Sequence, residues 1–176
     1  MKHLIKTLVV LLFVAGSITV PADNLLKDTS FSNNSGWSFW VDDPFRAAGG
    51  SVILQDGKAV VKSPDVEKQG TRGSGIQIIK FLDVEAGKSY KLKFKANAEK
   101  AGNLGVGYCL DKPPFTTYSE GVFIDLKPDQ TDYECVIAVK KDKDGKYDTP
   151  RTLRLFVGAF KDTKVVFSDV SFEEVK

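Results

Sequence analysis

Apolar and polar residues alternate along most of this chain, and a period of two is the pattern of a β-strand with one buried face. In Ser89–Ala98, "SYKLKFKANA", apolar residues occupy every second position from Tyr90 to Ala96, and lysines fill the three positions between them. No stretch of helix length carries a 3.6-residue period. We therefore expect an all-β fold built from half-buried antiparallel strands.

Further strands follow from the same alternation, with turn residues between them, such as the "DG" at Asp56 and Gly57. About ten short strands with no crossover helix predict a two-sheet antiparallel β-sandwich of the jelly-roll type. We find no internal repeat and no second domain. The other predicted strands are Trp37–Val41, Val52–Leu54, Lys58–Lys62, Gly75–Phe81, Leu104–Leu110, Val122–Leu126, Tyr133–Lys140, Leu153–Phe160 and Val165–Phe172.

The N-terminus has the pattern of a secretory signal peptide over residues 1–22. Lys2 and Lys6 precede a short apolar run, and small side chains before Ala22 suit a cleavage site. The apolar run is too short for a stable transmembrane helix, so we expect no membrane insertion after cleavage. The mature chain would be residues 23–176, a single secreted or periplasmic domain.

Charge and histidine content exclude several classes of function. Cleavage would remove Lys2 and Lys6 and leave 23 basic residues against 23 acidic ones, so we expect no nucleic-acid partner. The single histidine, His3, lies in the predicted signal peptide. The mature chain can therefore hold no histidine-based nucleophilic site and no histidine-ligated zinc. Chemistry that uses carboxylates alone is still open.

Two cysteines, Cys109 and Cys135, fall in different predicted strands. Alternation turns Cys109 outward and Cys135 inward, and the sequence leaves open whether an exported protein would bridge them.

The two tryptophans of the chain lie three residues apart in the stretch "GWSFW". In a strand over Trp37–Val41, Trp37 and Phe39 share one face, and Trp40 points to the other. We expect Trp37 and Phe39 to pack in the core and Trp40 to face solvent or a groove.

Other segments also present aromatic side chains on the outside. In Leu153–Phe160, alternation places Thr152, Arg154, Phe156 and Phe160 outward. The loop "KPPFTTY" presents Phe115 and Tyr118 after two prolines that stiffen it. Planar rings with hydrogen-bond donors among them suit a sugar, because the C–H faces of sugar rings stack on aromatics while the hydroxyls need polar partners.

Taken in order, these segments resemble the carbohydrate-binding modules of the family 4 and 9 kind, which are galactose-binding-like jelly rolls associated with cellulases and xylanases. The matching segments extend almost from end to end: "NLLKDTSF", "GWSFW", "GIQIIKFLDVEAGKSYKLKFKANA", "LRLFVGAF" and "VVFSDVSF". The resemblance implies a non-catalytic module that binds a polysaccharide or oligosaccharide in a groove on one sheet. It requires no cofactor.

The resemblance also implies which residues bind the sugar. Trp40 and Phe115 correspond to aromatic platforms, Asp111 and Lys80 to polar groove positions. Thr152 and Phe156 stand where glutamines are typical of glucan-binding members, a difference that argues against soluble β-glucan as the ligand. Together with Arg154, these seven residues form the predicted carbohydrate-binding site.

Members of the family often hold a structural calcium near the N-terminal strand. The corresponding ligands here would be the Asp169 carboxylate with main-chain oxygens near Ser30 and Gly57, although Asp169 could equally be a solvated or turn-capping residue.

Lys91, Lys93 and Lys95 form a row that we interpret as a solvated outer face. If that row lined the groove together with Lys80 and Arg154, acidic polysaccharides would be favoured.

Two other functions compete with the binding module. One is a jelly-roll glycosidase or polysaccharide lyase that uses carboxylates or Tyr118. The other is an adhesive or structural surface domain. For the binding module itself we expect a monomer.

Overall fold

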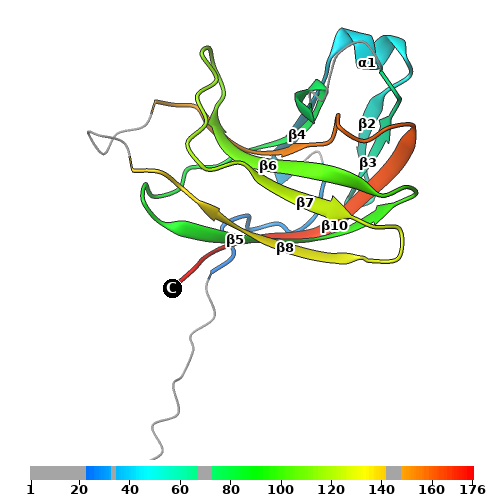
Figure 1. The fold of residues 1–176 in the computed structure, drawn as a ribbon. Coiled ribbons are helices and arrows are strands. Elements are labelled where there is room, and N and C mark those ends of the chain that lie inside the picture. The colour runs from blue at the N-terminus through cyan, green and yellow to red at the C-terminus, as the bar shows by residue number, and fades with distance from the viewer. Residues whose placement is uncertain (1–22, 33–34, 67–72, 142–147) are drawn as a thin grey trace, which may run out of the picture.

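The computed structural model describes residues 23–32, 35–66, 73–141 and 148–176. It is a sandwich of two five-stranded antiparallel sheets, which confirms the predicted fold class (Figure 1). The predicted signal peptide, residues 1–22, lies outside the described residues. Within the described ranges, no helix is both long enough and apolar enough to cross a membrane.

One sheet, here called the upper sheet because β4, β6 and β7 lie above β5 and β8 in Figure 1, has the strand order β1-β4-β9-β6-β7. Its strands are β1 (Trp37–Val41), β4 (Ile76–Phe81), β6 (Gly102–Leu110), β7 (Val122–Leu126) and β9 (Arg151–Phe156).

The lower sheet has the order β2-β3-β10-β5-β8. Its strands are β2 (Ser51–Gln55), β3 (Lys58–Ser63), β5 (Ser89–Ala98), β8 (Asp132–Ala138) and β10 (Thr163–Glu174).

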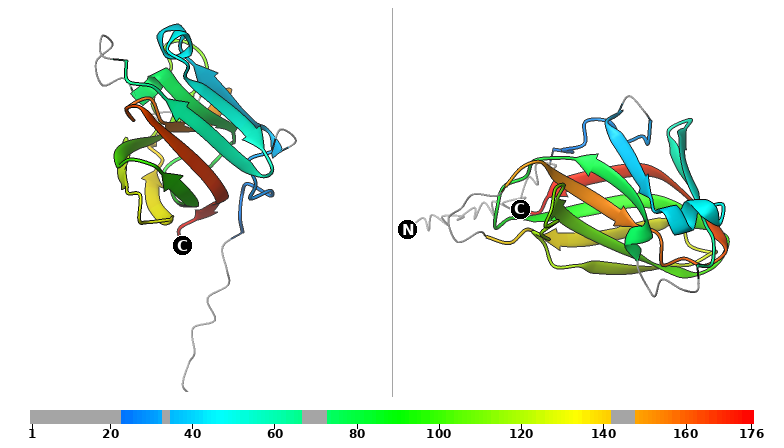
Figure 2. Two further views of the ribbon diagram at one scale, coloured as in Figure 1. Left: turned by 90° about the vertical axis from the view of Figure 1, so that its right-hand side faces the viewer. Right: turned by 90° about the horizontal axis from the view of Figure 1, so that it is seen from above.

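The turn between β2 and β3 has the predicted hairpin geometry. Asp56 and Gly57 both have positive φ, 51° and 73°, as a two-residue type I′ turn requires. The described helices are short: α1 (Asp43–Ala47) and the 3₁₀ turn η3 (Gly73–Gly75). Figure 1 shows α1 and the 111–121 loop rising above the upper sheet at opposite ends. Figure 2 shows the sandwich from two further sides.

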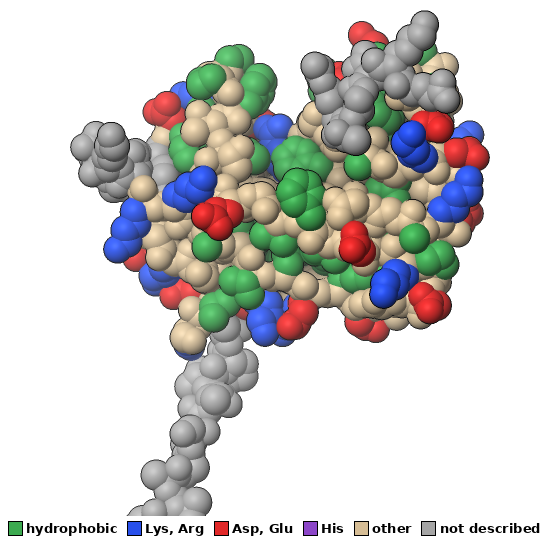
Figure 3. Space-filling view, viewed as in Figure 1, with side chains coloured by type: hydrophobic (Ala, Val, Ile, Leu, Met, Phe, Trp, Pro, Cys, Tyr) green, Lys and Arg blue, Asp and Glu red, His purple; other side chains and the backbone are tan. Residues whose placement is uncertain are grey.

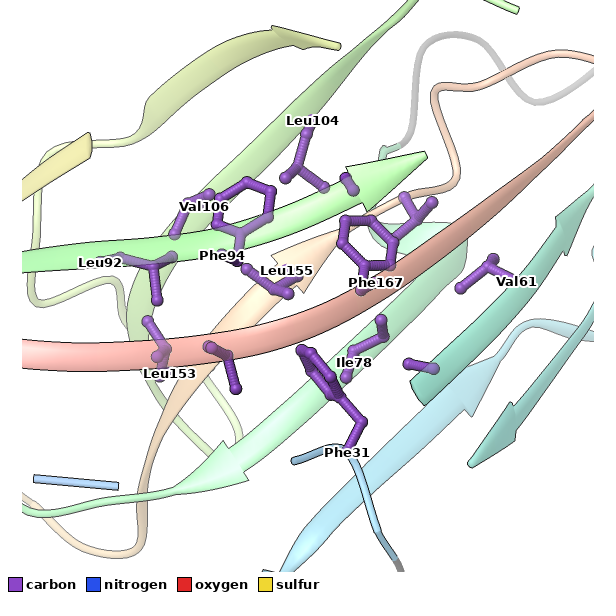
Figure 4. Packing of buried hydrophobic residues seen from close by; sticks show 14 of the residues in the cluster. Phe31, Val61, Ile78, Leu92, Phe94, Leu104, Val106, Leu153, Leu155 and Phe167 are labelled. Carbon is purple, nitrogen blue, oxygen red and sulfur yellow. The ribbon is translucent and has the colours of Figure 1, made fainter. Parts of the chain in front are cut away.

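The core lies between the two sheets and is made of the inward-facing residues of both, as Figure 4 shows for part of it. Trp37 is 4% exposed, and its ring centroid lies 4.6 Å from that of Phe31, so its predicted core position is confirmed. Phe39 is 48% exposed, so its predicted burial is wrong. β1 is the edge strand of the upper sheet, and a residue at an edge has a neighbouring strand on one side only.

The predicted strand Leu153–Phe160 extends past the C-terminal end of the observed strand, β9. β9 stops at Phe156, and the Phe160 amide donates to the Val157 carbonyl in a turn. Because alternation does not continue through a turn, Phe160 is buried at 1% exposure, whereas the sequence pattern had placed it outside.

Cys109 and Cys135 are free thiols. Cys109 lies on the outer face of the upper sheet, while Cys135 packs from the lower sheet against the core.

Candidate functional site

A groove on the outer face of the upper sheet is the candidate site. Its cavity of about 550 Å³ is within the range of small-molecule binding sites. Figure 3 shows a hollow between two raised parts of the surface, with hydrophobic side chains around it. The described residues lining it come from four strands, the 111–121 loop and η3: Trp40, Ser74, Gln77, Ile79, Cys109, Asp111, Phe115, Thr117, Arg154 and Phe156.

The floor of the groove is held by the guanidinium of Arg154, whose side chain is only 9% exposed. Nε donates to Thr152 Oγ1 at 2.9 Å, and one terminal nitrogen donates to Gln77 Oε1 at 2.9 Å. The other terminal nitrogen donates to the Asp111 carboxylate. The ion pair compensates the buried charge, so the floor is polar yet carries no net charge from this pair.

Trp40 stands at one side of the groove and is 52% exposed. It comes from the edge strand β1, and its indole Nε1 donates to Asp42 Oδ1 at 3.3 Å. This bond ties the indole edge to the side chain of Asp42, the residue before α1, so the ring is oriented before any ligand arrives.

Phe115 stands on the opposite side, on the 111–121 loop. Its φ of 54° is in the left-handed region, which costs a bulky residue roughly 1–3 kcal/mol. The turn is closed by the Phe115 amide, which donates to the Lys112 carbonyl at 2.7 Å. This backbone conformation brings the ring to 5.9 Å from the Arg154 guanidinium carbon, a cation–π distance, and leaves the ring 54% exposed.

Phe156, on β9, lines the same cavity as these two rings, and it is half-buried. Its ring extends over two glycines of β6: a Cβ at Gly105 would meet Phe156 Cβ at 3.2 Å, and one at Gly107 would meet Phe156 Cε2 at 3.3 Å. The absence of side chains at these positions lets the ring lie against the sheet.

Two of the predicted site residues do not reach the groove surface. Thr152 is completely buried; its Oγ1 accepts from Arg154 Nε and donates to the Cys109 carbonyl at 3.3 Å. The prediction that Thr152 contacts the sugar is therefore wrong. Thr152 lies beneath the floor of the groove and positions Arg154.

Lys80 points the other way. Alternation along β4 places Gln77 and Ile79 outward, so Lys80 shares the inward face with Ile78. Its ammonium donates to the Ser35 carbonyl and lies 5.9 Å from the centre of the Trp37 ring. Burial lowers the pKa of Lys80, an effect that the charge of Asp28 opposes. Lys80 is thus a core-edge residue, not a groove residue.

Gln77 is a groove residue that the sequence reasoning missed. Its amide oxygen accepts from Arg154, and its Nε2 donates to the Ser74 carbonyl at 2.7 Å. The side chain supplies the kind of amide that the resemblance expected at positions 152 and 156. The sequence could have indicated Gln77, because alternation along "IQIIKF" places its side chain on the outward face of the strand.

The lysine row lies on the lower sheet, away from the groove. Lys91 Nζ lies 3.8 Å from Glu134 Oε1, and Lys93 Nζ lies 3.3 Å from Glu173 Oε2. Acidic polysaccharides were expected only if the lysine row lined the groove together with Lys80 and Arg154. The row does not line the groove, so this condition is not met.

The predicted calcium ligands form a poor cation site. The Asp169 carboxylate pairs with Lys95 Nζ at 3.1 Å, and the Gly57 carbonyl accepts from the Phe31 amide at 2.9 Å. Ser30 Cβ packs against Gly57. Because Ca²⁺ needs several oxygen ligands and is repelled by an ammonium, this set does not fit it. Within the described residues, no group of three or more Asp, Glu, Cys or His side chains is placed so that it could hold a metal ion.

One thiol, that of Cys109, lies in the groove wall. Burial raises its pKa above the ordinary value, although the Arg154 charge opposes the shift. At neutral pH the group is therefore a protonated thiol, and a thiol is a poor nucleophile.

No protein-family model and no curated protein sequence matches the chain. Solved structures match it along most of its length. A structure described as "CBM4 structure and function" has a TM-score of 0.63 at 19% identity and covers 85% of this chain and 99% of its own.

Two further structures extend the comparison. The second N-terminal cellulose-binding domain of β-1,4-glucanase C from Cellulomonas fimi has a TM-score of 0.65 at 19% identity, over 90% of this chain and 98% of that domain. The CBM22-1 xylan-binding domain of Xyn10C from Paenibacillus barcinonensis has a TM-score of 0.52 at 11% identity, over 88% and 96%. The chain thus has the fold of the carbohydrate-binding modules, as the sequence resemblance predicted.

Proposed function

We propose that this chain is a non-catalytic module that binds a polysaccharide in the groove of the upper sheet. One observation carries the proposal: a single cavity with a polar floor is lined by three aromatic residues from three separate segments, Trp40, Phe115 and Phe156. The proposal is also supported by the fold of this chain, which cellulose-binding and xylan-binding domains share.

The groove has the two kinds of surface that a sugar chain needs. The exposed faces of Trp40 and Phe115 can stack on the C–H faces of sugar rings, and both rings are restrained by their own loops and bonds before binding. The Gln77 amide, the Asp111 carboxylate and the Thr117 hydroxyl line the same cavity and can exchange hydrogen bonds with sugar hydroxyls.

The charge of the groove favours a neutral glycan. Asp111 compensates the one cation among the described lining residues, Arg154. An anionic sugar would have to compete with Asp111 for a guanidinium whose three nitrogens each already donate a hydrogen bond. Neutral polysaccharides are therefore the expected ligands, and glucan is again among them because Gln77 supplies an amide that Thr152 and Phe156 lack.

The groove chemistry favours binding over catalysis. Glycoside hydrolysis by carboxylates uses two of them on either side of the bond. Among the described lining residues Asp111 is the one carboxylate, and it is committed to Arg154. Tyr118, the residue considered for a lyase, is half-buried against the core, and its amide donates to the Tyr108 carbonyl at 2.7 Å.

Export and a monomeric state belong to the same proposal. The signal-peptide pattern over residues 1–22 supports secretion or a periplasmic location. Sizing of the mature chain and sequencing of its N-terminus after expression with residues 1–22 would test both expectations.

Affinity electrophoresis through gels that contain neutral or acidic polysaccharides tests the proposal directly. The wild-type chain should be retarded by at least one neutral polysaccharide, and Trp40→Ala should weaken binding at least about 30-fold, as loss of a central aromatic contact typically does. The control is Ile53→Ala, since Ile53 is equally exposed at 51% but lies on the lower sheet. Both variants should keep the wild-type circular dichroism spectrum.

Three results would contradict the proposal. The first is an absence of retardation on every polysaccharide, together with a concentration-dependent sedimentation shift that indicates a protein partner. The second is retardation only by acidic polysaccharides and its loss at high salt, because screening weakens exposed charge contacts. The third is release of reducing or unsaturated sugar ends.

A further inference from the structure

A straight row of residues crosses all five strands of the upper sheet on its outer face. Trp40 on β1 is the Cα partner of Gln77 on β4, and Gln77 is the partner of Phe156 on β9. Phe156 is in turn the partner of Gly105 on β6, and Gly105 is the partner of Phe123 on β7. Because directly paired residues project to the same side of a sheet, this row has an aromatic ring at each edge and one at its centre.

Gly105 and Phe123 are the two members of this row that do not line the cavity described above, and Phe123 is the one of the two with a side chain. It is the most exposed of the large hydrophobic residues described, at 73%, and it lies on β7, the edge strand opposite to β1. A Cβ at Gly105 would lie 3.6 Å from Phe123 Cε1 and 3.2 Å from Phe156 Cβ. The space over Gly105 is therefore shared by the two phenylalanines, and the surface continues from the groove to Phe123.

The spacing of the strands sets the length of the row. Neighbouring strands lie about 4.8 Å apart, so the backbone positions of Trp40 and Phe123, four strand spacings apart, are separated by roughly 19 Å. That length exceeds a single sugar ring several times over. A ligand that contacts both ends must be a chain that runs across the strands.

We propose that Phe123 is an outer sugar-binding platform, and that the glycan lies across the sheet from Trp40 past Phe156 to Phe123. This inference rests on the function proposed above and adds a further contact residue at the edge of the sheet opposite to Trp40. The other apolar residues of β7 face the core, so the exposed ring of Phe123 on the outward face of this strand has a role in this arrangement. It prolongs the row, which already has Trp40 and Phe156 as aromatic members.

The test compares ligands of increasing length on wild type, Phe123→Ala and Ile53→Ala. The probes are cello-oligosaccharides and xylo-oligosaccharides from the disaccharide to the hexasaccharide, and the polysaccharide that retards the wild-type chain, measured by calorimetry and affinity electrophoresis. Wild-type affinity should rise with chain length until the row is filled. Phe123→Ala should bind the longest ligands about tenfold more weakly and the shortest ligands as wild type does. Ile53→Ala, which alters another exposed edge-strand residue, should match wild type at every length.

The results separate the two proposals. If Phe123→Ala binds ligands of every length as tightly as wild type does, the Phe123 platform is overturned and the groove is left as the binding site. An equal loss for short and long ligands also overturns it, because it indicates a disturbed groove. A change of oligomeric state in Phe123→Ala with unchanged sugar affinity would identify Phe123 as a protein contact instead. An absence of any sugar binding by wild type overturns the proposed function itself.

Discussion

The three nitrogens of the Arg154 side chain have bonding partners on three different strands or loops: Thr152, Gln77 and Asp111. At the scale of single residues this network explains why a charged side chain can be nine-tenths buried under a groove. A buried cation is costly to desolvate, and the cost is offset when its donors are satisfied and a carboxylate lies beside it.

The Asp111 carboxylate gives the first residue-scale prediction of stability. Asp111→Ala should lower the free energy of unfolding by about 2–3 kcal/mol, because the Arg154 guanidinium loses its counter-charge while it stays largely buried. Urea denaturation followed by tryptophan fluorescence measures the change.

A matched control for Asp111→Ala is Asp83→Ala. Asp83 pairs with Arg151 at 2.9 Å but is 72% exposed, so its loss should cost less than about 1 kcal/mol. Equal losses in the two variants would show that Arg154 does not depend on its carboxylate partner.

At the scale of elements, β4 joins the core to the groove. Its inward residues pack between the sheets, its outward Gln77 and Ile79 line the groove, and η3 leads into it at Gly75. Gly75 lies directly against the ring of Phe45, the buried residue of α1. Packing at this one position therefore holds α1 at its end of the upper sheet.

Gly75→Ala should be strongly destabilising for this reason. A Cβ at position 75 would lie 2.1 Å from Phe45 Cε2, and Phe45 is 3% exposed, so the ring has little room to move. We expect a loss of about 1–3 kcal/mol, typical of an overpacked core, measured by thermal or urea unfolding.

The comparison for this substitution is Gly121→Ala, where the nearest atom to a new Cβ is Phe123 Cε2 at 3.8 Å. That change should stay within about 0.5 kcal/mol of wild type. A Gly75→Ala chain as stable as Gly121→Ala would mean that α1 is not fixed by Phe45.

At the scale of the whole molecule, the sandwich keeps its two thiols apart. Cys109 belongs to the upper sheet and faces the groove, whereas Cys135 belongs to the lower sheet and faces the core. Burial raises the pKa of both thiols, that of Cys135 to about 11. Both are therefore protonated near neutral pH, and neither has a disulfide partner in the fold.

Reductant should consequently leave the melting temperature unchanged. A thiol reagent at pH 8 should react slowly with the native chain and titrate two thiols once the chain is unfolded in denaturant. A melting temperature that drops on reduction, or no titratable thiol in the unfolded chain, would show a disulfide and contradict the arrangement.

Much of the fold was predictable because strand alternation is a local property. The strands Ser89–Ala98 and Val122–Leu126 have the predicted bounds, and Trp37 and Trp40 lie on opposite faces as the pleat requires. The end of β9 was not predictable in this way, since the turn after Phe156 depends on how Phe160 packs into the core.

The sequence by itself determined the sandwich, the burial of Trp37 and the outward direction of Trp40, Arg154 and Phe156, because a period of two fixes which side of a sheet each residue faces. Only the tertiary structure decided which outward residues are exposed to solvent and which of them lie together in one site. Arg154 is covered by Asp111 and Phe115 from a distant loop, Thr152 is buried beneath it, and Lys80 lies on the inner face. Register, set by pairing between strands far apart in the chain, is also what aligns Trp40, Phe156 and Phe123.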